Sequence, residues 1–149
     1  MPYDVEGIKA TIPHRFPFQL VDRVISSGVT DEGKVDIVGI KNVTFNEPYF
    51  QSIKNEQPFL PNYLLMEIAA QLGCIRKLSD PEFSHMLGLY LGVDKAMFHK
   101  PVLPGDSLHV YVVEEGFKSG FGKCSSKIYV GEEIVAEVNF KYALTENNA

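Results

Sequence analysis

The chain has 149 residues, of which 45% are hydrophobic and 22% charged, with a formal net charge of −5 at pH 7. This composition is ordinary for a globular protein, and we expect residues 1–149 to form a single domain with its own core. The acidic balance argues against nucleic-acid binding, which needs a concentrated basic face, and no apolar run is long enough for us to expect a membrane span.

The first half of the chain predicts a short helical turn, two strands and a longer helix. The turn covers residues 5–10, and the strands cover residues 19–28 and 34–43, with the turn-like VTDEG between them. The helix is expected at residues 61–78, because a proline suits its first turn. Eight of the ten residues from 63 to 72 are apolar, so this helix should be buried on most sides.

The second half of the chain predicts four strands, at residues 85–98, 107–117, 122–130 and 133–145. In the last strand polar residues alternate with an apolar face, which we expect to consist of Ile134, Ala136, Val138, Phe140 and Tyr142. Such strands are typical of half-solvated antiparallel sheets. One buried helix among them predicts an α+β fold in which an antiparallel sheet wraps around a central helix.

The cysteines and histidines indicate no metal site and no cofactor. Cys74 and Cys124 are far apart, and the four histidines are scattered singly. A reduced chain in the cytoplasm is therefore the expected setting. The first residues show no basic start followed by an apolar run, so we expect no secretory signal.

A single acid, Glu67, interrupts the apolar part of the predicted helix. Gln71 follows four residues later, so the two side chains share one face and can touch. One interpretation is a solvated or amide-bonded glutamate at the edge of a core helix. The other is a carboxyl held in an apolar setting, where burial favours the protonated form that a general acid needs. The pattern alone leaves both interpretations open.

Four ordered blocks of this sequence resemble one known family. They are IPHRFPFQLVDRV (12–24), KNVTFNEPYF (41–50), LLMEIAAQ (64–71) and GVDKAMFHKPVLPGDSL (92–108). Together they are similar to the bacterial β-hydroxyacyl-(acyl carrier protein) dehydratases of fatty-acid synthesis, at similar spacing over nearly the whole chain. The resemblance implies the hot-dog fold, dimers or trimers of dimers with active sites at the dimer interface, and an acyl thioester on acyl carrier protein as substrate.

The resemblance also implies a two-group mechanism. In the family a histidine removes the α-proton of the thioester, and a carboxyl from the partner subunit's helix protonates the leaving hydroxyl. Backbone N–H groups, one of them at the helix N-terminus, stabilise the developing oxyanion. The family's loop reads His-Phe-Pro-Gly-x-Pro-x-Met-Pro-Gly, and the carboxyl follows five residues after the last glycine.

This chain departs from that loop. Glu67 keeps the carboxyl position, but Ile53 occupies the histidine position, residues 54–56 are Lys-Asn-Glu, and Asn62 replaces the last glycine. Isoleucine cannot accept a proton, so the family's base is missing. Asn62 still offers a backbone N–H, although its side chain occupies space where glycine lets the thioester approach. We do not expect His14 to take over, because the family carries that histidine without using it as the base.

Docking of acyl carrier protein is expected to be weakened. Family members bind this acidic partner through a basic patch near the pocket mouth. The chain keeps Lys95 and Lys100, but Met97 and His99 stand where arginines are usual.

The favoured hypothesis is a dehydratase-like subunit that lacks full activity alone. It would form a homodimer, or a heterodimer with an intact dehydratase to which it supplies Glu67. The substrate-binding residues are then expected to be Asn62, Gln71, Phe50, Phe59 and Leu60, the last three lining the acyl cavity. Two alternatives stay open: a hot-dog acyl-thioesterase in which Glu67 activates water, and a non-catalytic acyl-binding protein.

Overall fold

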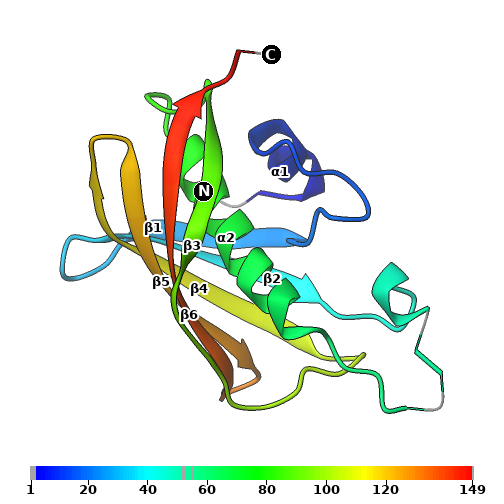
Figure 1. Ribbon diagram of the computed structural model, residues 1–149. Helices are drawn as coiled ribbons and strands as arrows, with labels where there is room; N and C mark the ends of the chain where they lie inside the picture. The colour runs from blue at the N-terminus through cyan, green and yellow to red at the C-terminus, as the bar shows by residue number, and fades with distance from the viewer. Residues whose placement is uncertain (1–2, 52, 55, 149) are drawn as a thin grey trace.

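The computed structural model describes residues 3–51, 53–54 and 56–148 and contains one sheet and one long helix (Figure 1). In chain order the elements are α1 (Val5–Thr11), β1 (Arg23–Val29), β2 (Val35–Asn42), the 3₁₀ turn η1 (Pro48–Phe50), α2 (Asn62–Leu78), β3 (Met86–Phe98), β4 (Ser107–Lys118), β5 (Phe121–Val130) and β6 (Glu133–Glu146). Each predicted element is present, with ends shifted by a few residues.

The six strands form one antiparallel sheet in the order β1-β2-β4-β5-β6-β3. The sheet curves around α2, which lies in its concave face, and α1 packs against α2 and β1 (Figure 1). This arrangement confirms the predicted α+β fold with a sheet wrapped around a central helix. The edge strands are β1 and β3, so the sheet can be extended from either side.

The helix α2 is buried on most of its surface, as its composition predicts. Its buried residues include Leu65, Ile68 and Leu72, each at most 1% exposed. Gly39 of β2 permits the close packing, because a Cβ atom built there would lie only 2.7 Å from the Leu72 side chain. Since α2 begins at Asn62 behind Pro61, the acid at Glu67 falls on its second turn.

One predicted strand face needs a correction. Ala136, Val138 and Phe140 are buried as expected, but Val135 is buried and Ile134 is only half-buried. The cause is a bulge, because Ile128 of β5 pairs with Ala136 while the next residue, Tyr129, pairs with Ile134. The extra residue shifts the alternation by one position, which the period-two pattern could not anticipate.

The edge strand β3 exposes apolar side chains. Leu89, Leu91 and Val93 are 48%, 53% and 38% exposed, and β3 pairs only with β6 among the strands of the described chain. A long apolar edge of this kind favours pairing with another strand. Of the helices described, none is long and apolar enough to cross a membrane.

Candidate functional site

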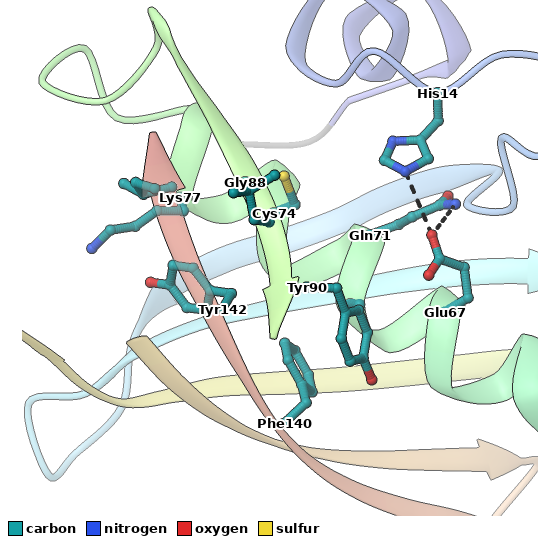
Figure 2. Close-up of a pocket in the computed structure, with 12 residues that line it drawn as sticks. His14, Glu67, Gln71, Cys74, Lys77, Gly88, Tyr90, Phe140 and Tyr142 are labelled. Atoms are coloured by element: carbon teal, nitrogen blue, oxygen red, sulfur yellow. Dashed lines mark hydrogen bonds and ion pairs between the residues drawn. The ribbon is translucent and has the colours of Figure 1, made fainter. Parts of the chain in front are cut away.

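Glu67 is held by two side chains that contact the same carboxylate oxygen. Gln71 Nε2 donates a hydrogen bond of 3.0 Å to Glu67 Oε1, and His14 Nε2 lies 3.5 Å from that atom (Figure 2). The Glu67 side chain is 23% exposed. Because both contacts involve Oε1, Oε2 remains for a proton or a ligand. The contact between Glu67 and Gln71 was predicted from their spacing and is confirmed.

The orientation of the Gln71 amide is set by backbone groups of the N-terminal segment. Its Oε1 accepts a hydrogen bond from Leu20 N (3.0 Å), and its Nε2 donates to Phe18 O (2.8 Å). Only the assignment of the NH₂ group to the Glu67 side satisfies all three contacts. Since Gln71 is 1% exposed, it acts as a fixed donor that holds the carboxylate of Glu67 in place.

A narrow cavity opens beside Glu67. Its volume is about 70 Å³. Its walls come from α2, the His14 segment, β3 and β6 (Figure 2). Burial raises the pKa of the Cys74 thiol to about 11 and that of Tyr90 to about 12, so both wall groups are neutral at pH 7. Across the described chain, no group of three or more His, Cys, Asp or Glu side chains could hold a metal ion.

His14 is a neighbour of Glu67 that sequence reasoning missed. No spacing rule joins the two positions, although His14 lies in one of the four blocks that carry the family resemblance. Its Nδ1 is buried without a hydrogen-bond partner among the described residues. A histidine base needs an acceptor on its second nitrogen to fix the tautomer. The geometry therefore favours His14 as a neighbour of the Glu67 carboxylate rather than as a replacement base.

The loop before α2 places an apolar side chain where the resemblance puts the base. Ile53 is half-buried against the core, and its N–H donates to Phe50 O (3.2 Å). Lys54 and Glu56 are exposed, and Asn55 lies outside the described residues. Nothing in this loop takes the place of a base beside Glu67 within the part of the chain that the structure describes.

The other predicted substrate-binding residues lie apart from the cavity of the single chain. Phe50 and Leu60 belong to the core at 2% and 1% exposed, whereas Phe59 is 49% exposed. Asn62 is exposed at the first position of α2, where Pro61 provides no side-chain cap for the helix N–H groups. Contact of these four residues with an acyl thioester stays a prediction for the assembled protein.

The predicted docking lysines are exposed, on and just after β3. Lys100 forms an ion pair with Glu133, and the neighbouring His99 Nε2 lies 2.9 Å from Glu137 Oε2. These carboxylates reduce the positive potential of the patch. The prediction that Lys95 and Lys100 dock an acidic partner remains, on a surface that is nearly balanced in charge.

Comparison with known proteins matches this chain to one family. The model of the FabA-like domain matches residues 12–139. The 3-hydroxyacyl-[acyl-carrier-protein] dehydratase FabZ of Desulforamulus reducens is 40% identical over 95% of this chain and 96% of its own length. That of Pelotomaculum thermopropionicum is 41% identical over 95% and 98%. Among solved structures, the dehydratase heterocomplex ApeI:P from Xenorhabdus doucetiae has a TM-score of 0.72 at 16% identity, covering 95% of this chain and 91% of that one.

Proposed function

This chain belongs to the FabA-like domain family, and we propose that it is a dehydratase subunit that supplies the acid, Glu67, to an active site completed by another chain. The curated relatives are 3-hydroxyacyl-[acyl-carrier-protein] dehydratases. The proposed substrate is accordingly a 3-hydroxyacyl thioester of acyl carrier protein, and the cytoplasm is the expected compartment.

One observation carries the proposal: the chain keeps the acid half of the family's site and lacks the base half. Glu67 is fixed by Gln71 and His14 and borders a cavity. Ile53, at the family's histidine position, packs against the core and cannot accept a proton. In the family the two groups come from different subunits, so a chain with this pattern can complete only one of the two sites in a dimer.

The reaction in such a composite site follows from these groups. A histidine of the other chain removes the proton from Cα, the electron pair forms the Cα–Cβ double bond, and the C–O bond at Cβ breaks. Glu67 gives its proton to the departing hydroxyl, which leaves as water. The N–H group of Gln71 then stabilises the carboxylate that forms, and His14 Nε2 lies 3.5 Å from it. Uncapped N–H groups at the start of α2 support the oxyanion of the thioester.

Association with a second chain is supported by the apolar edge of β3, which exposes Leu89, Leu91 and Val93. One structural neighbour is itself described as a dehydratase heterocomplex. We expect at least a dimer, and propose a heterodimer with an intact dehydratase as the active form.

Complementation tests this proposal directly. This chain would be co-expressed with an intact family member from the same genome. In that family member, the helix carboxyl would first be changed to an amide. Homodimers of either chain then lack one essential group, and only the heterodimer combines the partner's histidine with Glu67. Dehydration of a 3-hydroxyacyl thioester by the purified heterodimer is the expected result. Glu67→Gln should lower it by about 10²-fold or more, whereas the exposed Glu132→Gln should not.

Three outcomes would refute the proposal. A heterodimer that forms but gains no activity would show that Glu67 does not serve the partner's site. Thioester hydrolysis without dehydration, measured by the release of free thiol, would instead favour the thioesterase alternative. Failure of the chain to associate with any intact relative, together with binding of acyl thioesters, would favour the acyl-binding alternative.

A further inference from the structure

The cavity beside Glu67 extends along one stripe of α2. Its helix residues are Glu67, Ala70, Gln71, Cys74 and Lys77, which recur at the three- and four-residue spacing of a single helix face. At 1.5 Å per residue, Glu67 and Lys77 are about 15 Å apart along the axis. Figure 2 shows these two side chains at opposite ends of the pocket. The cavity is therefore elongated along this face of α2, and it is called the channel below.

The Lys77 end of this channel is polar, and its charged side chains are mostly buried. Lys77 Nζ lies 3.2 Å from Glu114 Oε1, with the two side chains 12% and 18% exposed. Tyr142 donates its hydroxyl to Glu114 Oε2, and the Phe117 ring centroid lies 3.5 Å from Lys77 Nζ. These four residues, Lys77, Glu114, Phe117 and Tyr142, are called the Lys77 cluster below.

The middle of the channel is more apolar than the end at the Lys77 cluster. Between Glu67 and Lys77 its walls include Ala70, Leu89 and Phe140, which favour an alkyl chain. Each buried methylene strengthens binding about fourfold. A chain that reaches the Lys77 cluster gains nothing further, because it meets an ion pair that loses stability when its charges are separated or desolvated.

We infer that the Lys77 cluster sets the upper limit on acyl-chain length for the channel of this chain. The β-carbon of the acyl group lies at Glu67 with the thioester toward the start of α2, the alkyl chain follows α2, and its methyl end stops at Lys77. The ligand class is therefore the unbranched short- and medium-chain acyl thioester. This inference rests on the proposed function in one respect, that the ligand is an acyl thioester.

Gly88 of β3 lies at a second position where the width of the channel can be changed by mutation. A Cβ atom built at Gly88 would lie 2.9 Å from Cys74 Sγ, closer than side chains normally approach. Gly88→Ala should therefore narrow the channel between Glu67 and Lys77, and lower the length limit. The double variant Lys77→Met with Glu114→Gln should raise the length limit. It removes both charges together, and the new amide still accepts a hydrogen bond from the Tyr142 hydroxyl.

The test is a series of binding titrations on the purified full-length chain, without a partner. The probes are N-acetylcysteamine thioesters of butyric, octanoic, dodecanoic and palmitic acid, used below their micelle concentrations in a calorimeter. For the wild type we expect affinity to rise by about fourfold per methylene at first and to level off between octanoyl and dodecanoyl. In the double variant the rise should continue to palmitoyl, and in Gly88→Ala it should stop at or before octanoyl. Lys127→Met, an exposed change of the same type on β5, should match the wild type.

The possible results separate this inference from the proposed function. Unchanged length profiles in a folded double variant, or in Gly88→Ala if the double variant does not fold, would overturn the role of the Lys77 cluster while leaving the dehydratase proposal intact. Absence of binding to every acyl probe would count against the proposed function as well. A dehydratase heterodimer that is active on palmitoyl-length substrates as readily as on octanoyl would also overturn the length limit.

Discussion

The acid-bearing face of α2 and the loop that precedes α2 match the family's pattern to different degrees. On α2, Glu67 retains a fixed amide donor, an imidazole neighbour and a cavity. The loop is anchored by a buried ion pair of 2.8 Å between Lys41 Nζ and Glu47 Oε1, and it carries Ile53 at the position that the resemblance gives to the base. The proposal of a subunit that contributes only the acid accounts for this difference between the two regions.

The largest expected effect is on the activity of the chain alone. The homo-oligomer should dehydrate 3-hydroxyacyl thioesters at least about 10²–10⁴-fold more slowly than an intact relative, because general-base catalysis contributes that factor. Ile53→His alone should restore little, since residues 54–56 and Asn62 still shape the loop differently. Steady-state rates on the same substrate check both statements. Turnover comparable to that of an intact relative would mean that a base exists elsewhere in this chain.

The next effect is on stability and concerns the ion pair between Lys41 and Glu47 that anchors the loop. Lys41→Met should lower the free energy of unfolding by about 3–5 kcal/mol, because it leaves the carboxylate of Glu47 buried without its cation. The two side chains are only 7% and 12% exposed. Chemical denaturation measures the change. The double change Lys41→Met with Glu47→Gln should recover much of the loss, and equal destabilisation in both variants would argue against the ion pair as the cause.

The fold was predictable from sequence because its signals are local. An apolar helix and period-two strands are written in consecutive residues, so α2 and all six strands were placed within a few residues. The exception was Ile134, where a bulge opposite Ile128 and Tyr129 of β5 shifts the alternation. A bulge depends on pairing between two strands, and neither strand alone encodes it.

The site was predictable only where its contacts lie within one helix. Gln71 and Glu67 are four residues apart, and their hydrogen bond followed from that spacing. His14 and Lys77 were missed as members of the cavity, because they reach it through tertiary packing that no periodicity reports. The assignment of Ile53 to the position of the family's base came only from the resemblance, since an isoleucine in a loop carries no chemical signal of its own.

A smaller effect on stability is expected from replacing Gln71, the residue that holds Glu67 in place. Gln71→Leu should lower the free energy of unfolding by about 1–3 kcal/mol, because the buried Leu20 N–H loses its acceptor and an unsatisfied buried backbone group costs about that much. Thermal or denaturant unfolding gives the value. Gln57→Leu in the exposed part of the loop is the matched control and should change stability by less than about 0.5 kcal/mol.

The smallest effect is the pH dependence of the free energy of unfolding, which reports whether water reaches Cys74 in the α2 cavity and Cys124 in the core. Burial raises the pKa of Cys74 to about 11 and that of Cys124 to about 12, from an ordinary value of 9.0. Because the unfolded chain loses these protons first, the stabilising contribution of each thiol is complete below pH 9 and is lost as pH rises through the folded pKa. By pH 10 each thiol should have removed about 1.4 kcal/mol from the free energy of unfolding. Denaturation curves at pH 8 and pH 10 for the wild type, Cys74→Ala and Cys124→Ala measure this difference. If Cys74→Ala leaves the pH dependence unchanged while Cys124→Ala reduces it, water reaches the Cys74 thiol, and the channel between Glu67 and Lys77 is wetter than an alkyl-binding channel should be.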